Sequence, residues 1–109
     1  GHAVGDRVLV QLAQRLREDT RNRDVLARIG GEEFLIVFDE TPPSQARDVC
    51  ERLRARVAAH PWHELAPGLT VTLSIGLAHA PPYRLEPLFE TADRAMYLAK
   101  QHGRNRIVG

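Results

Sequence analysis

A chain of 109 residues with 43% hydrophobic and 27% charged residues has the size and composition of one globular domain with a modest core. Its net charge of +1 excludes the strong basic excess of proteins that bind duplex DNA or an anionic membrane, so any basic site is local. A single cysteine, Cys50, excludes an internal disulfide. No apolar run approaches the ~18 residues of a membrane span, and we expect a cytoplasmic domain that makes no membrane contact itself.

The first half of the chain predicts a helix, a hairpin and a second helix. Residues 3–19 carry apolar side chains at helical spacing, which predicts an amphipathic helix. After a polar connection at 20–24, two β-type runs flank a glycine-rich turn and predict a hairpin at 25–38. The Thr-Pro-Pro-Ser sequence at 41–44 opens a second helix, with proline in the first turn and a hydroxyl cap available on either side.

The second half of the chain adds a strand, a helix and a short closing strand. Prolines make 60–68 a predicted loop, whereas apolar and polar residues alternate over 69–77 and predict a strand. Pro81-Pro82 breaks the chain before a third helix at 85–103, and 107–108 closes with a short strand. The order predicts an α/β (α+β) domain with an antiparallel hairpin in a mixed sheet. The expected buried stripe of the second helix consists of Ala46, Val49, Cys50, Leu53 and Val57.

The most informative segment is Gly-Gly-Glu-Glu-Phe at 30–34, in the turn of the predicted hairpin. Glycine supplies the positive φ of a tight turn and leaves room for a ligand. The adjacent carboxylates of Glu32 and Glu33 repel each other and fit a strand poorly, so a cation or a proton in transit is the expected compensation. Glycines that admit a phosphate beside carboxylates that hold a metal suit a nucleotide, although a solvated turn without function is the alternative.

Four further segments accompany this pentapeptide in a fixed order. They are Gly1-His2 with Gly5-Asp6, which matches GHxxGD; Arg21 to Asp24, which matches RxxD; Thr72 to Gly76, which matches TxSIG; and Ala92 to Asn105, which matches ADxAMYxAKxxGRN. In this order and spacing, the segments resemble the GGDEF domain, the diguanylate cyclase module of bacterial signalling proteins. The resemblance covers residue 1 to about residue 108.

The resemblance implies both a fold and a reaction. The fold is a ferredoxin-like or nucleotidyl-cyclase-like palm, with a central, mostly antiparallel sheet flanked by helices. The reaction condenses two GTP molecules into cyclic di-GMP and two pyrophosphates, with Mg²⁺ or Mn²⁺ as cofactor. Each domain holds one GTP, so a homodimer is required. The implied partners are GTP, cyclic di-GMP and an upstream sensory or receiver domain, with no nucleic acid polymer among them.

The resemblance also implies the residues at the catalytic turn. Glu32 and Glu33 bind the metal and activate the ribose 3′-hydroxyl, since hard cations prefer oxygen ligands. Glu32 is the favoured ligand, although the division of work between the two carboxylates stays open. Gly30 and Gly31 let the turn lie against the nucleotide.

Three charged residues elsewhere in the sequence are implied to bind the substrate. Lys100 and Arg104 reach the terminal phosphates, and Asp6 accepts hydrogen bonds from the guanine edge. Each has a structural alternative, because cations suit the end of a helix and acids suit its start.

An inhibitory site for cyclic di-GMP is implied at the RxxD segment. Arg21 binds phosphate or a guanine face, and Asp24 accepts from a guanine N–H edge. Arg52 on the following helix is a second inhibitory arginine or, alternatively, a solvated helical charge. Asp93 and Asn105 are expected to serve structurally, in caps or turns.

The sequence departs from the family pattern at one point. A complete member carries, before GHxxGD, a central strand ending in a metal-binding aspartate and then an asparagine that reads guanine, and these 109 residues contain neither. We therefore expect a domain at 1–109 that lacks its first central strand, has little or no cyclase activity alone, and forms dimers or oligomers through unpaired strand edges. An inactive module that binds cyclic di-GMP or GTP, and a scaffold that only dimerises, are the alternatives.

Overall fold

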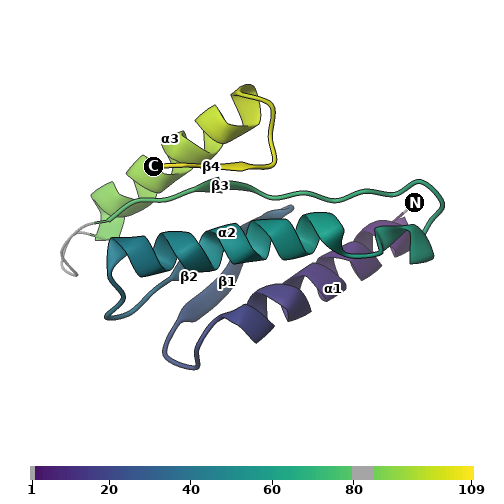
Figure 1. The fold of residues 1–109 in the computed structure, drawn as a ribbon, viewed down its shortest axis with the longest axis horizontal. Coiled ribbons are helices and arrows are strands. Elements are labelled where there is room, and N and C mark those ends of the chain that lie inside the picture. The colour runs from purple at the N-terminus through teal and green to yellow at the C-terminus, as the bar shows by residue number, and fades with distance from the viewer. Residues whose placement is uncertain (1, 80–84) are drawn as a thin grey trace.

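The computed structural model describes residues 2–79 and 85–109, with the backbone alone at His2, Leu85 and Glu86. Gly1 of the first motif and the predicted break at Pro81-Pro82 lie outside the described residues. The order of helices and strands is the predicted one (Figure 1). The elements are α1 (His2–Asp19), β1 (Val25–Gly30), β2 (Glu33–Val37), α2 (Pro43–Ala59), the 3₁₀ turn η1 (Trp62–Glu64), β3 (Ser74–Gly76), α3 (Leu85–Gln101) and β4 (Arg106–Val108).

The strands form two separate two-stranded sheets in the described part of the chain. β1 pairs antiparallel with β2, and β3 pairs parallel with β4. Helices α1 and α2 lie side by side over one face of the hairpin, and α3 packs against β3 and β4 (Figure 1). The mixed class of helices and strands is confirmed, but the central sheet expected from the sequence is divided into two halves.

The strand predicted at 69–77 is paired only at Ser74–Gly76, so the prediction is wrong for residues 69–73. This stretch runs as an extended segment alongside α2 (Figure 1). Its alternation is nevertheless real, because Leu69, Val71 and Leu73 pack against the buried core. A strand also requires a neighbouring backbone for its N–H and C=O groups, and alternation alone does not supply one.

The core forms where α1 and α2 meet the hairpin. Its buried members are Leu12, Leu16, Leu53, Val57 and Trp62. Trp62 is only 1% exposed, and its indole Nε1 donates a hydrogen bond to the Val57 carbonyl at 2.7 Å. The sequence predicts only a loop there, whereas the η1 turn carries the largest core side chain with its polar atom satisfied.

The buried stripe of α2 is confirmed at Ala46, Cys50, Leu53 and Val57, and Val49 is half-buried. The expected hydroxyl cap is wrong. Pro42 occupies the N-cap position without a side-chain hydrogen bond, and the Thr41 hydroxyl instead donates to the Asp39 carbonyl at 2.9 Å. Proline in the first turn starts this helix without a cap because its φ already suits helical backbone.

Gly76 allows β3 to approach α3 closely. A Cβ atom at this position would lie 1.9 Å from the carbonyl oxygen of Ala92 and 2.2 Å from the backbone nitrogen of Met96. Only a residue without a side chain fits this contact. The glycine of the TxSIG segment therefore sets how near α3 lies to the sheet.

Among the described residues, no helix is both long enough and apolar enough to cross a membrane.

Candidate functional site

A cavity of about 1360 Å³ lies between the two half-sheets and is lined by α1, β2, α2, the 69–79 segment and α3. Much of its lining is apolar side chains from β2 and from the extended segment. Its charged lining includes the five residues that the resemblance implies for metal and substrate binding: Asp6, Glu32, Glu33, Lys100 and Arg104. Residues from three distant parts of the chain thus meet at one hollow.

The hairpin turn brings two carboxylates to the cavity. Gly30 pairs with Glu33, so Gly31 and Glu32 form the turn itself. Both glycines have positive φ, 155° at Gly30 and 51° at Gly31. Arg28 donates from Nε to the Gly31 carbonyl at 2.7 Å, which holds the turn closed.

The two carboxylates of the turn differ in their exposure. Glu32 is exposed at the tip, and Glu33 is half-buried at the start of β2. The backbone of Gly30 and Gly31 is open to the surface, since nothing lies within 4 Å of a Cβ built at either. Neither glycine lines the cavity, so the space beside the turn and the cavity are adjoining but distinct.

The end of α3 brings two cations to the same cavity. Lys100 lies in the last turn and is half-buried. The helix ends with the Arg104 N–H donating to the Ala99 carbonyl and the His102 N–H donating to the Leu98 carbonyl, each at 2.9 Å. Gly103, with φ of 117°, is the left-handed residue that such an ending favours. This cap turns the chain back so that Arg104 follows the helix at the cavity.

A divalent metal fits the donor chemistry of the turn in part. Mg²⁺ is usually held by one or two carboxylates together with water and substrate phosphates, and Glu32 and Glu33 are two carboxylates on one cavity. Among the side chains that the structure describes, no group of three or more His, Cys, Asp or Glu residues is placed to hold a metal ion. The residues therefore suit an ion that takes its remaining ligands from the nucleotide or another segment.

The RxxD residues lie elsewhere, in the loop between α1 and β1, and do not line the cavity. Asp24 is 5% exposed, and its carboxylate accepts the backbone N–H of Arg21 at 2.8 Å and of Asp39 at 3.4 Å. The Arg17 guanidinium donates to the carbonyls of Arg21 and Asp24. These bonds fix the loop while leaving Arg21 exposed.

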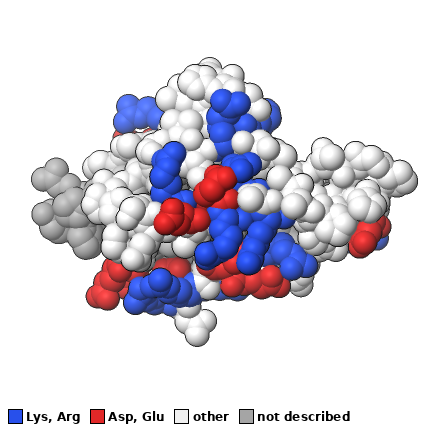
Figure 2. All heavy atoms as spheres, in the orientation of Figure 1, with Lys and Arg blue, Asp and Glu red and all other residues white. Residues whose placement is uncertain are grey.

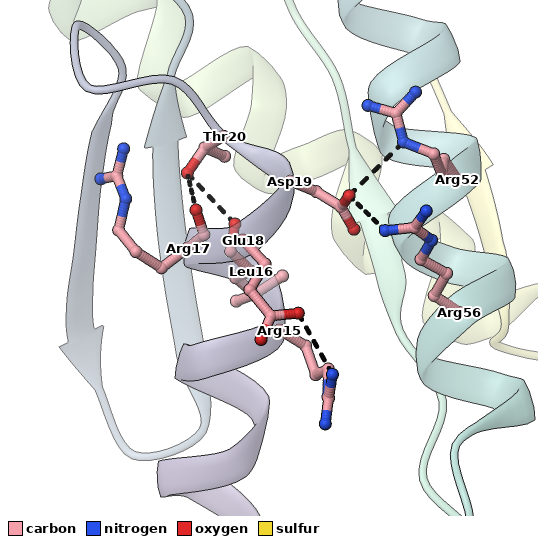
Figure 3. A network of polar contacts seen from close by, with 8 residues as sticks. All are labelled: Arg15, Leu16, Arg17, Glu18, Asp19, Thr20, Arg52 and Arg56. Carbon is pink, nitrogen blue, oxygen red and sulfur yellow. Dashed lines mark hydrogen bonds and ion pairs between the residues drawn. The ribbon is translucent and has the colours of Figure 1, made fainter.

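Asp19, at the end of α1, links this loop to α2. Its carboxylate, only 8% exposed, lies 2.5 Å from Arg56 Nη1 and 3.6 Å from Arg52 Nε (Figure 3). The ion pair tethers Arg52 beside the start of the loop that carries Arg21. Sequence reasoning missed Asp19 and Arg17. The available signal was electrostatic, because an acid at the negative end of a helix requires basic partners.

Comparison with known proteins identifies the family. The family described as "Diguanylate cyclase, GGDEF domain" matches residues 1–106. The chain belongs to this family. The GGDEF domain is 43% identical over 108 residues to diguanylate cyclase DgcP of Pseudomonas aeruginosa, and this match covers 98% of the chain but 16% of that protein.

Two solved structures share the fold. The active GGEEF domain of a diguanylate cyclase from Vibrio cholerae matches with a TM-score of 0.86 and 33% identity, over 99% of this chain and 69% of that one. The GGDEF domain of DgcB from Caulobacter crescentus, in complex with c-di-GMP, matches with a TM-score of 0.89 and 29% identity, over 99% and 66%. The predicted family and fold class are confirmed, and the Glu variant of the motif occurs in an active relative.

Proposed function

We propose that this GGDEF domain supplies one half of a diguanylate cyclase, which condenses two GTP molecules into cyclic di-GMP and two pyrophosphates. The observation that carries the proposal is one cavity whose charged lining includes two carboxylates at the hairpin turn, two cations at the end of α3, and Asp6 on α1. Each domain presents one such cavity, and the reaction joins two nucleotides. A homodimer with the two cavities facing each other is the arrangement this chemistry requires.

The charged residues divide the work by their chemistry. Glu32 and Glu33 hold the ion and accept the proton of the ribose 3′-hydroxyl. The 3′ oxygen attacks the α-phosphorus of the second GTP. The bond between this phosphorus and the oxygen that bridges the α- and β-phosphates breaks, and pyrophosphate leaves. Bound Mg²⁺ or Mn²⁺ supplies neutralisation of charge on the phosphate oxygens. Lys100 and Arg104 bind the terminal phosphates through charge-assisted hydrogen bonds.

The remaining substrate contacts are to the base and to the turn. Asp6 accepts hydrogen bonds from the two N–H groups on the guanine edge, for which a carboxylate has the matching acceptors. Gly30 and Gly31 let the nucleotide approach the hairpin, because no side chain occupies the space beside them.

Product inhibition is proposed at Arg21, Asp24 and Arg52. Arg21 is exposed on a loop that hydrogen bonds hold in place, and Asp19 draws Arg52 towards the start of this loop. Two arginines on a fixed frame suit a cyclic dinucleotide, since guanidinium groups bind phosphates in pairs of hydrogen bonds and stack on bases. Asp24 already accepts two backbone N–H groups and is only 5% exposed, so a guanine N–H reaches the remaining lone pairs of its carboxylate only if the loop shifts.

We further propose that an extended segment completes the cavity between β2 and β3 and supplies another carboxylate to the ion. Two observations support this: the described residues offer no group of three metal-ligating side chains, and residues 69–73 lack a paired strand. The 109-residue chain alone is then expected to turn over GTP slowly or not at all. Turnover near that of a longer family member, measured by pyrophosphate release, contradicts this proposal.

A second candidate function, a module that binds cyclic di-GMP without catalysis, is favoured by one observation. The residues around Arg21 and Arg52 are separate from the cavity, so they do not depend on a complete catalytic centre. Titration calorimetry with cyclic di-GMP separates this module from a scaffold that only dimerises, because the scaffold releases no binding heat.

The inhibitory site is tested by Arg21→Ala. We expect calorimetry to show about a tenfold loss of affinity for cyclic di-GMP, since one charge-assisted phosphate contact is removed. Arg23→Ala is the matched control, because Arg23 is an exposed arginine of the same loop. Unchanged affinity in Arg21→Ala, or an equal loss in Arg23→Ala, rules out the assignment of Arg21.

A further inference from the structure

The turn after α3 holds two non-glycine residues in left-handed backbone conformations. Arg104 has φ of 64° and Asn105 has φ of 46°, directly after Gly103. Residues with a Cβ adopt this conformation rarely, and consecutive ones persist only where the surroundings hold them. Arg104 lines the cavity, so the backbone of the strained turn determines the position from which its side chain extends.

Asn105 is anchored to Arg54 on α2, and neither residue lines the cavity. Its Oδ1 accepts a hydrogen bond from Arg54 Nη1 at 2.8 Å. Arg54 is itself oriented by Glu51, with Nε donating to Oε2 at 2.9 Å and Nη2 donating to Oε1 at 2.5 Å. The two-point contact with the carboxylate fixes the plane of the guanidinium and leaves Nη1 directed at Asn105.

A second contact, within the C-terminal segment itself, closes the turn. Arg106 donates from Nε to the Arg104 carbonyl at 3.0 Å, and β4 begins at Arg106. The strained turn is therefore bounded by the α3 cap before it, β4 after it, and the side chain of Arg54 beside it. Of these three, only Arg54 belongs to a distant part of the chain.

Arg54 differs from the other arginines on its helix. Figure 2 shows basic and acidic side chains mixed over α2. Arg54 is 22% exposed, whereas Arg52 and Arg56 are 49% and 57% exposed. An isolated pair between Glu51 and Arg54, one helical turn apart, contributes little. The third contact, to the left-handed Asn105 in the turn between α3 and β4, is what gives Arg54 a further role. The hydrogen bond from Arg54 also lowers the pKa of Glu51, so the pair stays charged below the usual range of a glutamate.

We propose that Arg54 is a positioning residue that acts through Asn105 to place Arg104 at the phosphates of bound GTP. The proposal rests on the proposed function, in which Arg104 binds the terminal phosphates. Neither Arg54 nor Glu51 lines the cavity, so neither touches the nucleotide there. Their effect is limited to the geometry of the turn, and it concerns the β- and γ-phosphates but not the base or the α-phosphate.

The test compares Mg·GTP with GMP by titration calorimetry on the 109-residue chain. We expect Arg104→Ala to lower the affinity for GTP about tenfold and to leave the affinity for GMP unchanged, because only GTP has the terminal phosphates. Arg54→Ala should lower the affinity for GTP at least about threefold, again without an effect on the affinity for GMP. The double variant should bind GTP as Arg104→Ala does, since residues on one pathway are not additive.

Two further variants and one measurement separate positioning from general stability. Arg54→Lys should fail to restore GTP affinity, because an ammonium cannot contact Glu51 at two points and still reach Asn105. Arg56→Ala, from the same helix, should bind GTP normally. The Arg104 amide, which donates to Ala99, should exchange hydrogen faster in Arg54→Ala than in the unmodified chain.

Each outcome decides between the two proposals. If Arg104→Ala weakens GTP binding and Arg54→Ala does not, the positioning role is overturned and the proposed function stands. Equal losses of GTP and GMP in Arg54→Ala also overturn it, because they indicate a structural effect alone. If Arg104→Ala leaves the affinity for GTP unchanged, Arg104 does not bind the terminal phosphates and the proposed function is wrong at this residue. If the Arg104 amide also exchanges at the same rate in Arg54→Ala, Arg54 does not anchor the turn.

Discussion

At the scale of single residues, burial decides whether a reactive group is available. Cys50 is 4% exposed in the stripe of α2, and burial raises its pKa to about 11, with the nearby charge of Arg47 opposing the rise. The thiolate is the reactive form of cysteine, so this side chain is inert at neutral pH. The sequence predicts the same, because Cys50 lies at helical spacing with apolar residues.

The raised pKa of Cys50 makes stability depend on pH. Above its ordinary pKa of 9.0 the thiol ionises in the unfolded chain, whereas the folded chain keeps the proton up to about 11. The free energy of unfolding therefore falls as pH rises from 9 towards 11, by about 1 kcal/mol at pH 10. Urea denaturation at pH 8 and pH 10 should show this loss of unfolding free energy. In Cys50→Ala the loss between the two pH values should be smaller by about 1 kcal/mol. An identical pH dependence in both chains contradicts the prediction.

Gly76 is a second residue whose identity is fixed by its surroundings, because the backbone of α3 leaves no room for a side chain. We expect Gly76→Ala to lower the free energy of unfolding by about 2 kcal/mol or more, because the new methyl group meets the backbone of Ala92 and Met96. Gly5→Ala is the control, since Gly5 lies in α1 with open space around it and alanine favours helix. Thermal unfolding measures both. Equal melting temperatures for the two variants refute the prediction.

At the scale of elements, side chains rather than backbone join α1 to α2 at their polar edge. Asp19 receives Arg52 and Arg56 from the neighbouring helix, and His60 Nε2 lies 3.0 Å from Gln11 Oε1. The apolar stripes of both helices are visible in the sequence. The polar contacts are not, because they depend on the crossing of the helices, which places residues together that lie far apart in the chain.

We expect Asp19→Ala to reduce the free energy of unfolding by about 1–2 kcal/mol, since it leaves two arginines without their partner beside a largely buried position. Glu18→Ala removes the exposed pair with Arg15 on the same helix and should cost less than about 0.5 kcal/mol. Chemical denaturation distinguishes them. A cost for Glu18→Ala that equals that of Asp19→Ala contradicts the argument.

At the scale of the whole molecule, the cavity between the half-sheets is the feature that joins stability to function. It holds the charged residues of the proposed catalytic site, and it also leaves apolar side chains of β2 and the 69–73 segment only half-buried. Unpaired strand edges and apolar surface favour association with another chain. The association expected here would therefore use the face that holds the proposed catalytic residues.

Leu35→Lys tests this link, because Leu35 is half-buried on β2, lines the cavity and is not part of the main core cluster. Light scattering should show the unmodified chain as a dimer or larger species at high concentration, and Leu35→Lys should shift it towards monomer. Val10→Lys, which changes an exposed valine outside the cavity, should leave the mass unchanged. A monomeric unmodified chain argues against association through this face.

The sequence by itself determined the local structure and the family. Helical spacing predicted α1, α2 and α3, glycines at 30–31 predicted the hairpin turn, and five motifs in order identified the GGDEF domain. These features are local because they follow from φ/ψ preferences and from which face of an element is apolar. They also named, as candidates for binding or catalysis, five of the charged residues that line the cavity.

The tertiary structure decided what depends on contacts between distant segments. It left 69–73 without a paired strand, placed Trp62 in the core, and joined Arg54 to Asn105 across 51 positions of the chain. The physical reason is that strand pairing and side-chain hydrogen bonds each require a second partner. Only the folded chain brings that partner within reach.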